Sequence, residues 1–367
     1  MKTLPISFIQ AKFINPKNIL KSIFWYFLRS FQINNIHKHK YIFIYHENLE
    51  EIKNLDIPKE IRLTSKIDNE TLILIYKFNL KLIIKNLKNI RRVRLIDKEF
   101  FLTSEASTRF RMYYFDFCSV SERNKYKMTS IENFYSLKKS LLETPVALLG
   151  TGPSFTEAKK VFVKNKYNII SCNSSIYDDE LWNGDCKILC FADPVFHFGI
   201  SKEANRFKNA VINRFENKKF YIVCPIFAVP ILIHNWGIDR KFVIGIDSLD
   251  SNGNDNILTS KNTSNVLTEF MLPLGSLIGK EIYFGGFDGR EKEEKEFWQY
   301  SDKTYQTLDE HKIQHPSFFS DRSMSKYYKQ HINILEKQIN DLEKQDYKLV
   351  NITKSFIPAL KKRGIDE

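Results

Sequence analysis

The sequence predicts an α/β protein in which a doubly wound, mostly parallel sheet occupies the C-terminal two-thirds of the chain. Short apolar runs of strand length alternate there with segments of helical periodicity. This alternation is typical of parallel strands that are joined by crossover helices. The apolar runs occupy 145–149, 168–172, 186–191, 220–224, 242–246, 281–284 and 347–352. In such sheets ligands bind beyond the carboxyl ends of the strands.

The segments between these runs have the spacing of amphipathic helices. Apolar side chains recur every three or four residues through 324–342, and similar patterns cover 202–215 and 266–278. Ser154 and Glu157 form the S-x-x-E pattern of a capping box shortly after the first run. That pattern predicts that a helix starts at this point.

The first 143 residues differ in composition, which predicts two domains, 1–143 and 144–367. We expect the first to be a basic region of mixed α/β character. Before Glu47 it carries seven Lys or Arg residues and no Asp or Glu, and aromatic side chains such as Trp25 lie among them. This combination favours a helix in the headgroup layer of an anionic membrane. An ordinary helix packed on the protein body explains it equally well.

Composition narrows the class of protein. Of the 367 residues 43% are hydrophobic, which excludes a mainly disordered chain. The net charge of +13 suits an anionic partner. Five cysteines without a CxxC pair indicate buried thiols in a reducing cytoplasm. No apolar run reaches the roughly 18–20 residues that a membrane span needs, so we expect a cytoplasmic protein.

Glycines and small polar residues follow several of the predicted strands. A glycine turn before a helix suits an anion, because free N–H groups and the positive end of the helix dipole face it. Each such residue is also a common loop or N-cap residue. Their recurrence at successive strand ends nevertheless indicates a nucleotide cleft. The candidates are Gly150, Thr151, Gly152, Ser154, Asn173, Asp193, Thr263, Ser264 and Asp288.

In order and spacing these motifs resemble the bacterial sialyltransferases of glycosyltransferase family forty-two. The resemblance covers roughly 145–360. The similar segments are GTGPSF at 150–155 (GNGPSL in the family), SCN at 171–173 (RCN), FADP at 191–194 (a strand end with a small polar residue and proline), TSN at 263–265 (TSG) and KEIYFGGFD at 280–288 (a KEIY strand ending in GID).

The resemblance implies a Rossmann-like domain and an inverting, metal-independent glycosyltransferase. The expected donor is a CMP-activated sugar, with no other cofactor, and the expected acceptor is a surface glycan or glycolipid. Thr151 and Asp193 each replace an asparagine of the family. Because of these departures, Kdo, legionaminic acid or pseudaminic acid, each also carried on CMP, could replace sialic acid. We expect the enzyme to work peripherally at the inner face of the cytoplasmic membrane.

The resemblance also suggests roles for single residues. Phosphate contacts fall to the backbone around Gly152, to Ser154 and Thr263, and to two lid tyrosines, for which Tyr300 and Tyr305 are the candidates. Asn173 and Ser264 are expected at ribose and base. His315 is the candidate general base, because imidazole titrates near neutral pH and accepts a hydroxyl proton. His311 and His197 stay open as alternatives.

Two other interpretations stay open. A pyrophosphokinase-like enzyme with the same GPS turn would need ATP and magnesium. A basic module that binds membranes or nucleic acid is the non-enzymatic alternative. Basic residues are not interleaved with aromatic ones on the predicted strands, so we expect no nucleic-acid partner. We also expect no metal, since 250–261 lacks glycine at the sixth position and glutamate at the twelfth position of a calcium loop.

Overall fold

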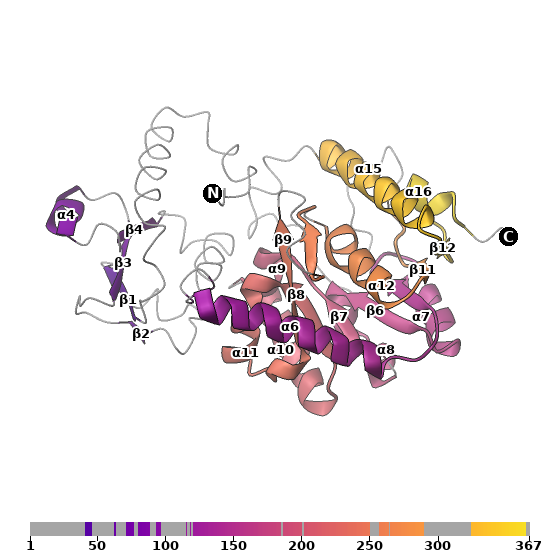
Figure 1. Cartoon of the computed structure of the whole chain (residues 1–367), viewed down its shortest axis with the longest axis horizontal. Helices are drawn as coiled ribbons and strands as arrows, with labels where there is room; N and C mark the ends of the chain where they lie inside the picture. Colours follow the sequence, from indigo (N-terminus) through magenta and orange to yellow (C-terminus); the bar gives the residue numbers. More distant parts are fainter. Residues whose placement is uncertain are drawn as a thin grey trace.

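The computed structural model describes residues 41–45, 62–63, 71–76, 80–88, 93–96, 115, 118, 120–184, 186–199, 202–249, 257–263, 265–289 and 324–364. These residues form two sheets, one of four strands and one of eight, and the strands of both sheets are parallel. Figure 1 shows the larger sheet with its helices. The candidate site belongs to this larger unit.

The eight-stranded sheet is all-parallel, with the order β10-β9-β8-β7-β6-β5-β11-β12. The chain starts this sheet at β5, builds outward on one side as far as β10, and then returns to the other side of β5 with β11 and β12. The strand order therefore reverses between β5 and β11. The strands are β5 Val146–Leu149, β6 Asn168–Cys172, β7 Ile188–Cys190, β8 Tyr221–Pro225, β9 Val243–Leu249, β10 Thr259–Lys261, β11 Glu281–Gly285 and β12 Lys348–Asn351.

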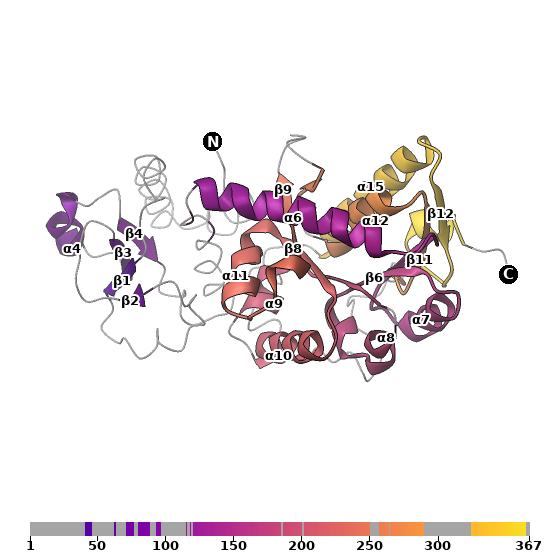
Figure 2. The ribbon, with the colours of Figure 1, turned by 60° about the horizontal axis from the view of Figure 1, so that its bottom comes forward.

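Helices cover both faces of this sheet (Figure 2). Successive side chains of a strand point to opposite faces, and in β5 Ala147 and Leu149 join one core while Val146 and Leu148 join the other. The first core is covered by α7 Phe155–Lys164, α8 Asp179–Asn183, α9 Pro194–Phe198, α10 Lys202–Asn217 and α11 Val229–His234. The second is covered by α6 Val120–Ser140, α12 Leu272–Ile278, α15 Met324–Glu343 and α16 Pro358–Lys361.

Helix α6 precedes the predicted boundary at 143/144 but packs on the larger sheet. Its Phe134 is fully buried in the second core. Its Asn133 Nδ2 donates hydrogen bonds of 2.7 Å to the carbonyl of Arg240 and of 2.8 Å to that of Val243. The division into 1–143 and 144–367 stays a prediction, but α6 is part of the layered unit that carries β5–β12.

The four-stranded sheet has the order β2-β1-β3-β4. Its elements are β1 Tyr41–Tyr45, β2 Arg62–Leu63, β3 Thr71–Tyr76 and β4 Val93–Ile96, with α4 Leu80–Lys85 between the last two. The basic and aromatic segment around Trp25 lies outside the described residues, so the interfacial helix stays a prediction. Among the helices that the structure describes, none combines the length and apolarity needed to cross a bilayer.

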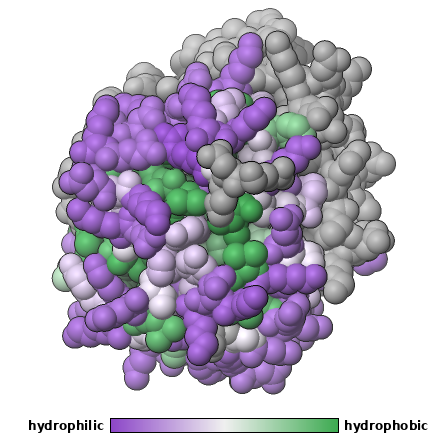
Figure 3. All heavy atoms as spheres, turned by 90° about the vertical axis from the view of Figure 1, so that its right-hand side faces the viewer, coloured by the Kyte–Doolittle hydropathy of each residue, from purple (hydrophilic) through white to green (hydrophobic). Residues whose placement is uncertain are grey.

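The far edge of the larger sheet is formed by β12. Viewed from that side, apolar side chains form a band bordered by polar ones (Figure 3). Lys348 begins this edge strand, is largely exposed, and pairs with Glu281 of β11 at 2.6 Å. A charged lysine on an edge strand disfavours pairing with a further strand. The bridge between Asn351 and Gly364 covers the other end of β12.

The seven predicted strands of the larger sheet are confirmed to within three residues at each end. The helices predicted over 202–215 and 324–342 are also confirmed, as α10 and α15. Strand β10 was not predicted. The helix predicted over 266–278 begins with a π-helical turn, η7 Leu267–Met271, before α12.

We predict that His331 makes the fold sensitive to mild acid. This α15 side chain is 7% exposed, and its Nδ1 has no hydrogen-bond partner among the described residues. Burial lowers the pKa of the imidazole to about 4, whereas the unfolded chain titrates near 6.5. The unfolded state therefore binds more protons between these values, and stability that is present above pH 6.5 falls as the pH drops toward 4.

The expected loss between about pH 7 and pH 4.5 is about 2 kcal/mol from this residue alone. Urea unfolding of the wild type and of H331F at both pH values measures it. The wild type should lose about 2 kcal/mol more than the variant. Equal losses in the two proteins would contradict the prediction.

Candidate functional site

The candidate site begins where the strand order reverses, between β5 and β11. Both strands end in a turn that contains glycine, and the two turns contact each other. The backbone N–H of Gly150 donates to the carbonyl of Gly285, and that of Gly152 donates to the carbonyl of Gly286, both at 2.9 Å. In open parallel sheets, this reversal point at the carboxyl ends is where ligands bind.

The contact between the two turns leaves no room for side chains. A Cβ placed on Gly150 would lie 2.5 Å from the carbonyl oxygen of Gly286, closer than real Cβ contacts. Gly286 has a φ of +74° and faces the carbonyl of Gly150 equally closely. The sequence suggested that glycine is needed in the first turn because it lets a ligand approach closely. The structure adds a second reason for glycine at these positions, because the two turns approach each other closely.

Ser154 and Asp288 join the two turns more tightly. The Ser154 N–H donates to Asp288 Oδ1 at 3.1 Å and to Oδ2 at 3.2 Å, and the Ser154 Oγ donates to Oδ2 at 3.0 Å. Burial raises the pKa of the Asp288 carboxyl, and the hydrogen bonds from Ser154 partly oppose that shift. The helix start predicted here is confirmed, because Ser154 is the N-cap residue of α7. The predicted capping box is wrong, because the Ser154 side chain makes no cap bond and binds Asp288 instead.

This arrangement changes what the N-terminus of α7 offers to a ligand. The resemblance assigned Ser154 to a phosphate, but the carboxylate of Asp288 already accepts hydrogen bonds from the N–H and the Oγ of Ser154. A second anion placed against that carboxylate would be repelled, since like charges at close range are unfavourable. Asp288 is an acceptor, so this position suits a hydroxyl or amino group of a ligand.

Asn173 follows β6, the strand next to β5. It has a φ of 46°, a left-handed conformation that asparagine tolerates better than most residues. Its Oδ1 is buried and has no hydrogen-bond partner among the described residues. A buried oxygen without a donor is costly. Asn173 therefore offers a ligand an unused acceptor at the strand end beside the glycine turns.

Asp193, at the end of β7, is used within the protein. Its Oδ1 accepts the N–H groups of Val195 and Phe196, both at 2.8 Å, which makes it the N-cap of α9. His197 is buried, and its Nδ1 lies 2.8 Å from the carbonyl oxygen of Asp193. Its ring packs against Phe207. These contacts give both polar residues a structural role in holding α9.

Thr263 lies beyond β10 at the opposite edge of the sheet. Four strands separate β10 from β5, which corresponds to about 24 Å across the sheet at ~4.8 Å per strand. Thr263 is buried, its Oγ1 lies 2.8 Å from that of Thr268, and its N–H donates to Glu269. The Oγ of Ser248 donates to the same carboxylate at 2.5 Å. These contacts of Thr263 are thus with its own loop and the helix that follows it.

Thr151 is the remaining candidate among the described residues, and it is half-buried in the first glycine turn. The other predicted site residues lie outside the described residues, and their roles stay predictions: Ser264, Tyr300, Tyr305, His311 and His315. Across the described part of the chain, no group of three or more His, Cys, Asp and Glu side chains could hold a metal ion.

The cysteines match the expectation of buried thiols. All five are free and buried. Burial raises the pKa of Cys172 and of Cys186 to about 12. A thiol with such a pKa is protonated near neutral pH and is a poor nucleophile.

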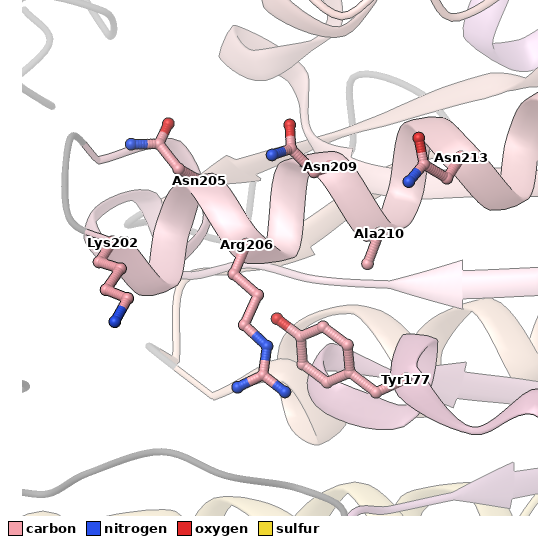
Figure 4. Close-up of a pocket in the computed structure, with 7 residues that line it drawn as sticks. All are labelled: Tyr177, Lys202, Asn205, Arg206, Asn209, Ala210 and Asn213. Atoms are coloured by element: carbon pink, nitrogen blue, oxygen red, sulfur yellow. The ribbon is translucent and has the colours of Figure 1, made fainter.

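Sequence reasoning missed a polar surface on α10. A shallow hollow of about 580 Å³ lies along this helix and against Tyr177, the last residue of the 3₁₀ helix η4 Asn173–Tyr177 (Figure 4). The guanidinium of Arg206 lies 4.8 Å from the centre of the Tyr177 ring. The sequence signal that could have found this surface is the recurrence of asparagine at every fourth position of α10.

Comparison with protein-family models gave no match, and comparisons with curated proteins and with solved structures gave none either. The fold and the geometry of the described residues are therefore the structural basis for a functional proposal. They define a parallel α/β protein with a polar site where the strand order reverses.

The contact between the glycine turns can be tested with two matched substitutions. Gly286 and Gly237 have similar φ values, +74° and +69°, but a Cβ on Gly237 would meet nothing within 4 Å. G237A should cost about 1 kcal/mol for the left-handed backbone alone. G286A should cost about 3 kcal/mol, because it also forces the two turns apart. Urea unfolding measures both, and equal losses would contradict the tight contact.

Proposed function

We propose that this chain is an inverting, metal-independent glycosyltransferase with a Rossmann-like nucleotide-binding domain. It transfers a sialic-acid-like or Kdo-like sugar from a CMP-activated donor to a surface glycan. The observation that carries the proposal is the meeting of the 150–154 and 286–288 turns where the strand order reverses, beside the unpaired Oδ1 of Asn173. These are three of the segments in which the sequence resembles glycosyltransferase family forty-two.

The hydrogen-bond donor groups of cytidine fit the acceptors at the carboxyl ends of β6 and β11. Cytosine carries an amino group that donates hydrogen bonds, and Asn173 Oδ1 is an acceptor without a donor among the described residues. The Asp288 carboxylate suits a ribose or sugar hydroxyl, as acidic residues bind ribose in other nucleotide sites. In this assignment both residues recognise the nucleoside and neither contacts the phosphate.

The departing phosphate needs other partners. Charge builds up on CMP as the glycosidic bond breaks, so hydrogen-bond donors fixed near the phosphate lower the barrier. We assign this role to Tyr300 and Tyr305. We assign the role of general base, which deprotonates the acceptor hydroxyl, to His315. Thr263 and Ser264 would contribute only if the donor extends along the strand ends toward β10.

We place the enzyme at the inner face of the cytoplasmic membrane. The net charge of +13 and the basic stretch before Glu47 support this placement, because an anionic leaflet attracts such a segment. A peripheral position would bring a lipid-linked acceptor to the enzyme.

A thermal-shift comparison of CMP, CDP, UDP, GDP and ATP, with and without magnesium, tests the donor class. At about one hundred times its dissociation constant, CMP should raise the Tm by roughly 5–10 °C, with or without chelator. Stabilisation by ATP only in the presence of magnesium would contradict the proposal and favour a pyrophosphokinase-like enzyme. Steeply salt-dependent DNA binding without a CMP effect would favour the basic binding module.

Substitution of Asn173 locates the binding. N173G removes the amide and tolerates the left-handed backbone, so it should cut the CMP shift by at least half while the protein stays folded. The matched control is N165G at the exposed C-cap of α7, which should keep the full shift. An unchanged shift in N173G would contradict the assignment of the nucleoside to this edge.

A further inference from the structure

Helix α10 carries a polar surface that the proposed donor site does not use. Asn205, Asn209 and Asn213 recur at every fourth position and form one row along the helix, while Lys202 and Arg206 belong to the neighbouring row (Figure 4). Residues four apart on a helix are neighbours, about 5–6 Å from each other. The three amides therefore form a regular ladder of donors and acceptors along the hollow.

The described fold gives no reason for the amides of Asn209 and Asn213. Asn209 and Asn213 are exposed and have no side-chain hydrogen bond among the described residues. Asparagine is a weaker helix former than alanine, lysine or glutamate, because its side chain competes for backbone hydrogen bonds. Exposed asparagines at these two positions thus weaken α10 without a compensating side-chain hydrogen bond among the described residues.

Arg206 stacks on an aromatic ring beside this ladder. Its guanidinium lies over the ring of Tyr177 at 4.8 Å, and stacking of this kind leaves the N–H edge of the plane free. Glu203 forms a long ion pair with Arg206, but its Oε2 is 3.9 Å from Arg206 Nη1, too far for a hydrogen bond. A planar guanidinium with free N–H groups matches a carboxylate in a two-point contact.

The chemistry of the surface favours a carbohydrate over a nucleic acid. Amides pair with neighbouring hydroxyl groups because they offer a donor and an acceptor side by side. Single-stranded nucleic acid needs exposed aromatic faces and dense positive charge. Here the stacked guanidinium covers one face of Tyr177, and Asp179 pairs with the nearby Arg214 at 2.6 Å.

The surface also continues from the proposed donor site. Tyr177 ends the same 3₁₀ helix that Asn173 begins. At about 2 Å per residue, this helix separates the two residues by about 8 Å. A glycan bound along α10 would therefore end close to the strand ends of β6 and β5.

We propose that the hollow along α10 binds a carboxylate-bearing oligosaccharide, with the asparagine ladder on its hydroxyl groups and Arg206 on its carboxylate. The inference rests on the proposed function only in naming this oligosaccharide as the acceptor. Binding itself does not require that the chain transfers a sugar.

Calorimetric titration of the full chain with 3′-sialyllactose and with lactose tests this proposal, without any CMP-sugar present. The sialylated sugar should bind at least tenfold more tightly, because lactose lacks the carboxylate. R206Q should remove that preference. N209A/N213A should weaken both sugars at least fivefold while the Tm stays equal or rises, since alanine is the better helix former.

The matched control is N217A, which makes the same substitution at the last residue of α10, outside the hollow. Its affinities should stay within twofold of the wild type. The proposal is overturned if 3′-sialyllactose does not bind, if the N209A/N213A protein binds like the wild type, or if a short single-stranded DNA displaces the sugar.

A separate measurement of CMP release from a CMP-sugar distinguishes this inference from the proposed function. Sugar binding along α10 without CMP release would contradict the glycosyltransferase and leave the binding surface standing. CMP release without sugar binding would support the enzyme and overturn the surface.

Discussion

The close contact between the turns after β5 and β11 is the constraint on which the rest of the site depends. The chain leaves β5 on one side of the sheet and returns on the other, so these turns come from segments far apart in the sequence. Backbone hydrogen bonds from Gly150 and Gly152 join them, and a side chain at Gly286 would separate them. The contact also brings Asp288 to Ser154, which sets the chemistry at the N-terminus of α7.

Under the proposed function, that chemistry would separate recognition of the nucleoside from recognition of the phosphate. Asp288 follows β11 and Asn173 follows β6, the two strands on either side of β5. Both side chains are acceptors, and both suit ligand groups that donate hydrogen bonds. Thr263 follows β10, and four other strands lie between β10 and β5. Under the proposed function, the described residues would thus supply one half of the donor site, on β5, β6 and β11. The polar surface of α10 adjoins that half through η4, which is where an acceptor would need to lie.

Much of the fold could be predicted from the sequence because buried parallel strands are continuous apolar runs. Strand β10 could not, since it is only Thr259–Lys261 and is held by pairing with β9. The capping box failed for a similar reason. Its serine bonds to Asp288, a residue 134 positions away, and no local pattern reports such a contact. Asp193 was found at the right strand end, but its oxygen caps α9.

The central claim is that cytidine monophosphate binds where the strand order reverses. Titration of the isotope-labelled full chain with CMP, followed by backbone amide chemical shifts, tests it most directly. The account predicts that the largest changes occur at Gly152, Ser154 and Asn173, with Asp288 among the next largest. Changes confined to α10 or to the four-stranded sheet, or no saturable change at all, would contradict it.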